Sequence, residues 1–218
     1  MRKEGDSRPG SDAANASDCL RTQRHPTERE GLMQPAHFAA MHTRGGYTMD
    51  EVASALQKSI RRGEERQAIF WATELDLTGY GNYAWKRLRI ICSEDIGIAW
   101  TEGPAVIRAL YENWVEARKA EKDRPPERSN AILYLVHAVV LLARAPKSRL
   151  VDNACALFYA GDRQAMRMDI PDYALDHHTA RGRRLGRTEA TAYDRSYRIE
   201  NCTLDDPYEN EARAIDAA

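Results

Sequence analysis

The chain has 218 residues, of which 43% are hydrophobic and 30% are charged, so it is long enough to bury a substantial core. Its 32 lysines and arginines nearly balance its 33 aspartates and glutamates, which gives a formal net charge of -1. This balance excludes a globally basic protein that coats nucleic acid, although it is compatible with a local basic patch.

Composition divides the chain into three parts. Residues 1–46 are rich in Ser, Arg, Glu, Pro and Gly, and too few are large and apolar to offset the entropy of ordering, so we predict disorder there. Apolar periodicity begins after this segment and fades in the last third of the chain. We therefore expect a helical domain at 47–188 and a loose, acidic tail at 189–218.

The chain shows no sign of a membrane span or of a disulfide framework. Its longest apolar run, at 131–143, is shorter than the roughly 18 residues of a membrane span, and the N-terminus lacks the apolar region of a signal peptide. We expect a cytoplasmic protein. Four scattered cysteines without a CxxC pair are expected to be separate reduced thiols: Cys19, Cys92, Cys155 and Cys202.

Apolar residues spaced three and four apart predict a first group of three helices. The first is expected to begin at a capping box, in which the Thr48 oxygen accepts from an early backbone N–H and Glu51 reaches back to the cap. Gly63 is expected to end this helix. A second helix is predicted over about 64–77, and a third after a tight glycine-containing break at 78–81.

The same spacing predicts three further helices. Pro104 fits the first turn of the fourth, because its missing N–H costs nothing there. Ser129 is expected to cap the fifth, at 130–144, which is apolar nearly all round and should be the central buried helix. Ser148 is expected to cap the sixth, which ends at Gly161. Strand signals are almost absent, so the predicted fold is all-α, a compact domain of about six or more helices.

The sequence holds no motif of the common enzyme classes. A P-loop, a GxGxxG fingerprint, HExxH and GxSxG are all missing, so no catalytic residues and no cofactor are predicted. One group has a composition typical of metal sites: Asp172, Asp176, His177 and His178. Neighbouring histidines on a helix point about 100° apart, so a polar surface segment is the favoured interpretation and a metal-dependent activity the weaker one.

Basic and aromatic residues raise the alternative of nucleic-acid binding. Four arginines beside two glycines can follow a phosphate backbone, or equally pair with helix C-termini and acidic groups: Arg181, Arg183, Arg184 and Arg187. Four tryptophans can stack on bases, although their helical spacing favours the core: Trp71, Trp85, Trp100 and Trp114. His137, on the apolar fifth helix, is expected to be a hydrogen-bonded histidine of the core or of an interface.

Four strings occur in a defined order: SALQKSIR at 54–61, FWA at 70–72, KRLRIICSEDIG at 86–97 and APKS at 145–148. Together they resemble the C-terminal helical region of the RarA/MgsA ATPases, relatives of the clamp loaders that act in replication-fork maintenance and recombination. The resemblance covers roughly 48–186 and departs most at 176–184. The positions singled out in it are Gln57, Lys58, Arg61, Arg87, Arg89, Ser93, Glu94, Asp95, Pro146, Lys147 and Ser148.

In that family the region follows an AAA+ ATPase module and is associated with assembly into tetramers. The resemblance therefore implies a helical fold and self-association as a dimer or tetramer, without ATP hydrolysis by these 218 residues. Arg87 and Arg89 are expected to form an ion-paired helix junction with Glu94 and Asp95. The segment 146–148 is expected to stop one helix and cap the next.

The leading hypothesis is a non-catalytic oligomerisation or adaptor protein that serves DNA replication, recombination or repair through DNA or protein partners. The alternatives are a nucleic-acid binder that uses the four arginines at 181–187, a metal-dependent enzyme, and an interaction protein of a mobile element that shares the fold alone.

Overall fold

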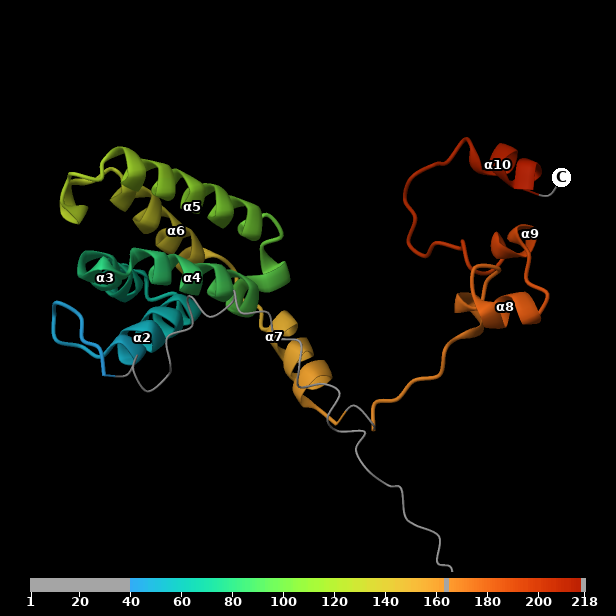
Figure 1. Cartoon of the computed structure of the whole chain (residues 1–218), viewed down its shortest axis with the longest axis horizontal. Helices are drawn as coiled ribbons and strands as arrows, with labels where there is room; N and C mark the ends of the chain where they lie inside the picture. Colours follow the sequence, from blue (N-terminus) through green and yellow to red (C-terminus); the bar gives the residue numbers. More distant parts are fainter. Residues whose placement is uncertain (1–39, 163–164, 217–218) are drawn as a thin grey trace, which may run out of the picture. The chain divides into compact units, whose positions relative to one another are not determined.

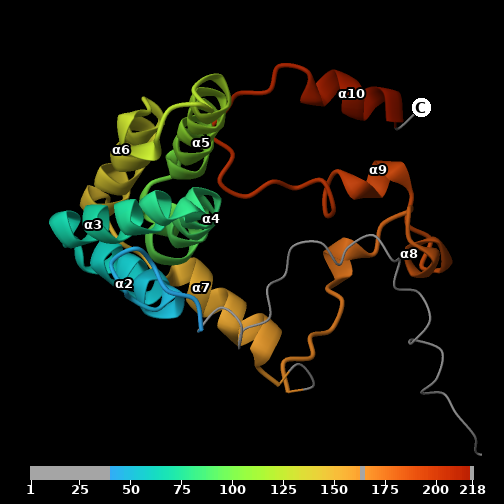
Figure 2. The same cartoon turned by 60° about the vertical axis from the view of Figure 1, so that its left-hand side comes forward.

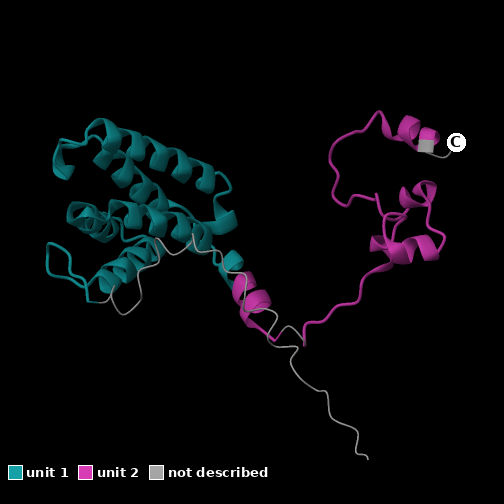
Figure 3. Cartoon of the chain, in the orientation of Figure 1, with its two compact units in different colours: residues 1–153 teal, residues 154–218 magenta. Residues whose placement is uncertain are grey.

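The structure is a computed structural model that describes residues 40–162 and 165–216. All regular elements among these residues are helical, and their single β-bridge joins His42 to Thr48, so the all-α prediction is confirmed. The chain divides into two compact units, residues 1–153 and 154–218 (Figure 3). No described helix is both long enough and apolar enough to cross a membrane.

The first unit is a bundle of five long helices followed by the start of a shorter one (Figure 1). Its elements are α2 (Met49–Arg62), α3 (Glu65–Leu75), α4 (Gly81–Ile91), α5 (Gly103–Ala120), α6 (Ala131–Arg144) and α7 (Leu150–Cys155). Helix α6 packs along α5, as Figure 2 shows, and also contacts α2, α3 and α4. The core formed in this way includes Met49, Leu56, Ile60, Leu75, Trp85, Leu88, Ile91, Ile107, Leu135 and Leu142.

Helix α2 has the predicted bounds but not the predicted N-terminal cap. Gly63 ends it in the left-handed conformation, with φ 73°, as expected of a C-terminal glycine. The predicted capping box is wrong, because Thr48 makes no side-chain bond to the backbone. Its hydroxyl instead donates to Glu51 Oε2 at 2.7 Å, so the two side chains satisfy each other. Met49 and Val52 of this first turn are buried, and the Met49 N–H donates to the Met41 carbonyl at 3.0 Å.

The break predicted between α3 and α4 is a π-helical turn, Asp76–Tyr80, in which Gly79 has φ 94°. Asp76 is buried and forms an ion pair with Arg118 of α5. The guanidinium of Arg118 also lies 5.5 Å from the ring centroid of Trp114. The turn is therefore tied to α5 by one buried charge. Of the four tryptophans, Trp85 and Trp114 lie in the core, as their spacing predicts.

Helix α6 begins and ends near its predicted bounds, but it is not buried all round. Leu133 is 65% exposed, and His137, one turn further on, is exposed as well. His137 therefore lies outside the core, which leaves an interface as the remaining expectation for it. A helix that is apolar on every side has no polar face to mark which side meets solvent, so the sequence could not show this orientation.

The second unit contains short elements. A π-helical turn, Ala156–Ala160, continues α7 and ends at Gly161, where the sixth helix is predicted to stop. It is followed by α8 (Ala180–Arg184), α9 (Glu189–Ala192) and α10 (Glu209–Asp216). Helix α10 is not among the predicted elements, because its segment carries few apolar residues. Of the segment predicted to be disordered, residues 1–39 lie outside the described residues, and residues 40–46 lead through a turn into α2.

Burial raises the pKa of Asp76 and thereby predicts a pH dependence of stability, although the charge of Arg118 opposes the shift. Because the folded chain holds this proton more tightly than the unfolded chain, the residue's contribution to stability is largest below about pH 4 and is lost as the pH rises through the folded pKa. The unfolding free energy of the wild type minus that of Asp76→Asn should therefore fall as the pH rises above about 4, the unfolded pKa of the residue, in urea titrations.

Glu65→Gln is the control of opposite sign. A hydrogen bond from Arg144 lowers the pKa of Glu65, so its contribution is present above the unfolded pKa and is lost as the pH falls. The expectation for Asp76 would be contradicted if the unfolding free energy of the wild type minus that of the variant increased with pH for Asp76→Asn as well as for Glu65→Gln.

Candidate functional site

The most densely bonded polar group in the first unit is centred on Asp95, whose side chain is fully buried. It lies in a π-helical turn, Cys92–Ile96, that continues α4. The next residue, Gly97, has φ 51° and ψ -128°, a conformation that side chains other than glycine rarely adopt. If this position carried a Cβ atom, that atom would lie 3.3 Å from Val151 Cγ2. The glycine therefore reverses the chain where the start of α7 lies against the turn.

Two residues of α2 bind the buried carboxylate. Arg61 donates from Nε to Oδ1 at 2.6 Å and from Nη2 to Oδ2 at 3.4 Å, so its contact is bidentate. The amide of Gln57 donates to Oδ2 at 3.1 Å. Because a buried carboxylate is costly unless it is paired and hydrogen-bonded, these donors allow Asp95 to lie in the core.

A second arginine reaches the same carboxylate from the start of α7. Arg149 donates from Nη1 to Asp95 Oδ1 at 3.1 Å and forms an ion pair with Asp152. Glu94 lies at the edge of the cluster, 3.2 Å from Arg61 and 3.5 Å from Arg149. Two guanidinium groups therefore face three carboxylates. Arg149 is not among the residues predicted from the sequence, because nothing in its local pattern shows that it lies beside a carboxylate 54 residues earlier.

The predicted partners of Glu94 and Asp95 are wrong. Arg87 donates to the side-chain oxygen of Gln57, which fixes the orientation of that amide, and it makes no ion pair with a described residue. Arg89 lies 4.6 Å from the centroid of the Tyr111 ring. Successive helical residues are about 100° apart, so positions 87 and 89 point in nearly opposite directions and cannot serve one carboxylate.

The segment 145–148 acts as the stop and cap that its sequence predicts. Helix α6 ends at Arg144, and Lys147 Nζ donates to the carbonyl oxygens of Leu142 and Ala143 at 3.0 and 2.8 Å. Burial lowers the pKa of Lys147, and the charge of Asp95 opposes this shift. The backbone N–H of Ser148 donates to the Asp95 carbonyl at 2.9 Å, and the Ser148 hydroxyl accepts from the Leu150 N–H at 3.3 Å.

We call this arrangement the Asp95 network. It comprises Gln57, Arg61, Arg87, Glu94, Asp95, Lys147, Ser148 and Arg149. The other positions of the resemblance lie outside it: Lys58 contacts Ser54, Ser93 and Pro146 are exposed, and Arg89 faces α5. Because the carboxylate oxygens of Asp95 are occupied by four donors, the network is suited to joining segments rather than to proton transfer.

The four arginines at 181–187 divide into two pairs. Arg183 donates to the carbonyl oxygens of His177 and His178 at 3.1 and 2.8 Å, and Arg187 forms an ion pair with Asp172 at 2.8 Å. Arg181 and Arg184 are exposed and pair with no described carboxylate. The structure therefore leaves two of these four cations available for an external anion.

The proposed metal group has other partners. Asp172 binds Arg187 and Arg195, and Asp176 accepts from the backbone N–H of His178 at 3.0 Å. Within residues 40–162 and 165–216, no group of three or more His, Cys, Asp or Glu side chains is arranged to hold a metal ion. Cys92, Cys155 and Cys202 are free thiols, and Cys19 lies outside the described residues.

Fold and site together define a class: an all-helical domain whose α2, α4 and α7 segments are joined by a buried, arginine-bound aspartate. Comparison with known families identifies it further. The model of the MgsA AAA+ ATPase C-terminal family matches residues 64–212, so the chain belongs to that family, and the strings at 70–72, 86–97 and 145–148 lie within the match.

Similar proteins carry related names. Replication-associated recombination protein A of Bacillus subtilis is 31% identical over 189 residues, which cover 83% of this chain and 41% of the relative. The Escherichia coli protein of the same name is 28% identical over 138 residues, covering 62% and 29%. An uncharacterized AAA domain-containing protein of Mycobacterium tuberculosis is 29% identical over 156 residues, covering 71% and 32%. The chain thus spans about two-fifths or less of these relatives.

Asp95→Asn is expected to destabilise the first unit by about 2–3 kcal/mol, because it removes the buried charge that binds two partly exposed guanidinium groups. Urea unfolding followed by circular dichroism measures the change. Glu94→Gln is the matched control, since Glu94 is a quarter exposed and should cost about 1 kcal/mol or less. Equal losses in the two variants would show that burial of the Asp95 carboxylate does not control stability.

Proposed function

We propose that this chain is a non-catalytic helical module that self-associates and supports DNA replication, recombination or repair as an adaptor. The match to the MgsA C-terminal family over residues 64–212 carries the proposal, and the name of two relatives, replication-associated recombination protein A, supplies its biological setting. In bacteria such as those relatives come from, this setting is the cytoplasm.

The distribution of polar chemistry supports a non-catalytic role. Buried polar groups of the first unit are used to join helices: Asp95 has four donors, and Asp76 is paired with Arg118. The sequence carries no phosphate-binding loop motif. Function is therefore expected on exposed surfaces, where side chains are free to meet a partner.

The outer face of α6 is the surface that best supports self-association. Leu133 and His137 are exposed on it, and Val136 and Val140 are partly exposed on the same side. These positions follow each other at three- and four-residue spacing, so they form one stripe along the helix. Contiguous exposed apolar surface is typical of protein interfaces, and a second copy of the chain is the partner we propose for it.

Leu133→Glu is expected to shift a dimer or tetramer towards the monomer, because a carboxylate would be buried without a partner when α6 faces meet. A penalty of about 2 kcal/mol raises the dissociation constant roughly thirtyfold per contact. Size-exclusion chromatography with light scattering, across micromolar concentrations of the full chain, measures this change.

Val115→Glu is the control, since Val115 is an exposed apolar residue on α5 rather than α6. It should leave the mass unchanged. A wild-type chain that is monomeric throughout the range would refute self-association, and a shift with Val115→Glu alone would move the interface to α5.

Direct DNA binding is the second candidate function, and it rests on one observation. Arg181 and Arg184 are exposed and carry no carboxylate partner among the described residues, whereas Arg183 and Arg187 are used within their own unit. Two unpaired guanidinium groups one turn apart can contact neighbouring phosphates of a nucleic-acid backbone.

Replacing Arg181 and Arg184 together by Gln should weaken DNA binding and reduce the slope of log K against log salt by about 1.8, the value for two lost phosphate contacts. Fluorescence anisotropy with a short duplex at several salt concentrations measures both quantities. The matched control replaces Arg62 and Arg66, exposed arginines of α2 and α3, by Gln. An unchanged slope in the first variant would refute a role for these arginines.

A further inference from the structure

Three aromatic rings form a cluster at the surface of α3. Phe70 and Trp71 are neighbours on this helix, and Tyr47 lies in the turn that precedes α2. Their ring centroids are 4.8–6.3 Å apart, and their planes are close to perpendicular, with angles of 78–87°. Trp71 packs against the core, whereas Tyr47 is 40% exposed and Phe70 is 47% exposed. We call these three residues the aromatic cluster.

Hydrogen bonds hold the turn that carries Tyr47 against α3. The backbone N–H of Gly45 donates to Glu74 Oε1 at 2.6 Å, and that of Arg44 donates to Thr78 Oγ1 at 3.0 Å. A Cβ atom at position 45 would lie 2.9 Å from Tyr47 Cε2, so a side chain there would displace the ring. The Tyr47 ring is therefore positioned beside α3 before any partner binds, which lowers the cost of binding.

An exposed arginine lies towards each end of the aromatic cluster. Arg66 is one helical turn before Phe70, so the two side chains lie on the same side of α3. Arg44 lies at the other end, where its backbone is bonded to Thr78 in the π-helical turn that follows α3. Neither arginine forms an ion pair with a described residue. Glu74 opposes their charge, but its Oε1 already accepts from a backbone N–H.

The two arginines are far enough apart to bind different phosphates of one strand. Arg66 and Thr78, the residue that holds Arg44, are 12 residues apart, which corresponds to about 18 Å of helical rise. Neighbouring nucleotides of a stacked strand are about 3.4 Å apart, so this distance spans several nucleotides. The aromatic cluster lies between the two charges, where the bases of these nucleotides would be.

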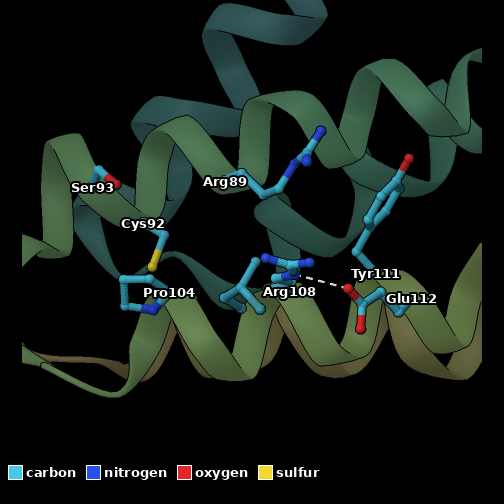
Figure 4. Close-up of a pocket in the computed structure, with 8 residues that line it drawn as sticks. Arg89, Cys92, Ser93, Pro104, Arg108, Tyr111 and Glu112 are labelled. Atoms are coloured by element: carbon cyan, nitrogen blue, oxygen red, sulfur yellow. Dashed lines mark hydrogen bonds and ion pairs between the residues drawn. The ribbon is translucent and has the colours of Figure 1, made fainter.

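The exposed rings require bases whose faces are free. In a duplex the bases are stacked on one another, so a protein meets their edges and the phosphates. In a single strand the bases can turn outwards and stack on aromatic side chains. Tyr47 and Phe70 offer such rings, whereas the ring of Tyr111 already has the Arg89 guanidinium 4.6 Å from its centroid (Figure 4).

We propose that the aromatic cluster binds single-stranded nucleic acid, with bases stacked on Tyr47 and Phe70 and flanking phosphates on Arg44 and Arg66. Trp71 supports the two exposed rings from the side of the core. Because every base has an aromatic face, this mode of binding tolerates any base sequence. The site is separate from the pair Arg181 and Arg184, which belongs to the second unit, and it does not require self-association.

Three labelled oligonucleotides separate stacking from charge: a thymidine strand of about 12 nucleotides, an abasic strand of the same length, and the thymidine strand paired with its complement. Fluorescence anisotropy with the full chain measures the affinity for each. The thymidine strand should bind most tightly. The abasic strand keeps the phosphates but has no base to stack, so it should bind more weakly by about fivefold or more.

Tyr47→Leu and Phe70→Leu each remove an aromatic face but keep an apolar side chain beside Trp71. Each should weaken binding of the thymidine strand by about fivefold or more and leave binding of the abasic strand unchanged. Tyr208→Leu, which replaces an exposed tyrosine of the second unit, is the matched control and should bind as the wild type does. Circular dichroism of each variant establishes that the fold is retained.

Replacing Arg44 and Arg66 together by Gln should reduce the slope of log K against log salt by about 1.4 for the thymidine and the abasic strand alike, the value for two phosphate contacts of a single strand. The same double variant should leave duplex binding unchanged. Arg108→Gln is the control, because this exposed arginine is already ion-paired with Glu112 at 2.8 Å, as Figure 4 shows.

Three results would overturn the proposal: no tighter binding of the thymidine strand than of the abasic strand, no tighter binding of it than of the duplex, or wild-type affinity in both leucine variants. Loss of single-strand binding only when Arg181 and Arg184 are replaced would assign nucleic-acid binding to the second unit instead. The leucine variants should keep the oligomeric mass of the wild type, so failure here is distinguishable from failure of self-association.

Discussion

Burial of the Asp95 carboxylate is the constraint on which the helical bundle depends. A buried charge is tolerated only where hydrogen-bond donors surround it, and these donors come from segments far apart in sequence: Arg61 is 34 residues before Asp95 and Arg149 is 54 residues after it. The backbone N–H of Ser148 binds the carbonyl oxygen of the same residue. Correct placement of α2, the turn after α4 and the start of α7 is therefore required simultaneously. An arrangement that lacks one of these segments leaves a charge in the core without its partner.

This constraint changes the meaning of the strings that resemble the RarA/MgsA C-terminal region. Their polar residues are of the types that active sites use. The side chains of Gln57 and Arg61, however, donate their hydrogen bonds to the Asp95 carboxylate. The strings therefore mark how helices are joined, and Asp95, which lies within the residues matched to the family, is at the centre of that junction. Function is therefore proposed on other residues, namely the exposed face of α6 and the pair Arg181 and Arg184.

Local signals made most of the fold predictable. Gly63 and Gly161 end their helices and Pro104 lies in the first turn of α5, because each acts through its own backbone. Contacts between residues far apart in sequence could be predicted less well. The spacing of Arg87 and Arg89 looked suitable for the carboxylates at 94 and 95, but pairing depends on which neighbouring helix each side faces. The outer face of α6 was equally hidden, since an apolar sequence contains no polar residues to mark the solvent side.

Arginine has three different roles in this chain, and the supply of carboxylates distinguishes them. Arg61 meets a buried aspartate, so its charge is used to hold the fold. Arg89 has an aromatic ring beside it in place of an acid, so it is oriented but not neutralised. Arg181 has neither and is exposed to solvent. The net charge of the chain is close to zero. This sum does not show where a basic side chain lacks an acidic partner, and at such a position the local charge is positive. An external anion binds most favourably at such a position, because no carboxylate of the chain competes with it for the guanidinium.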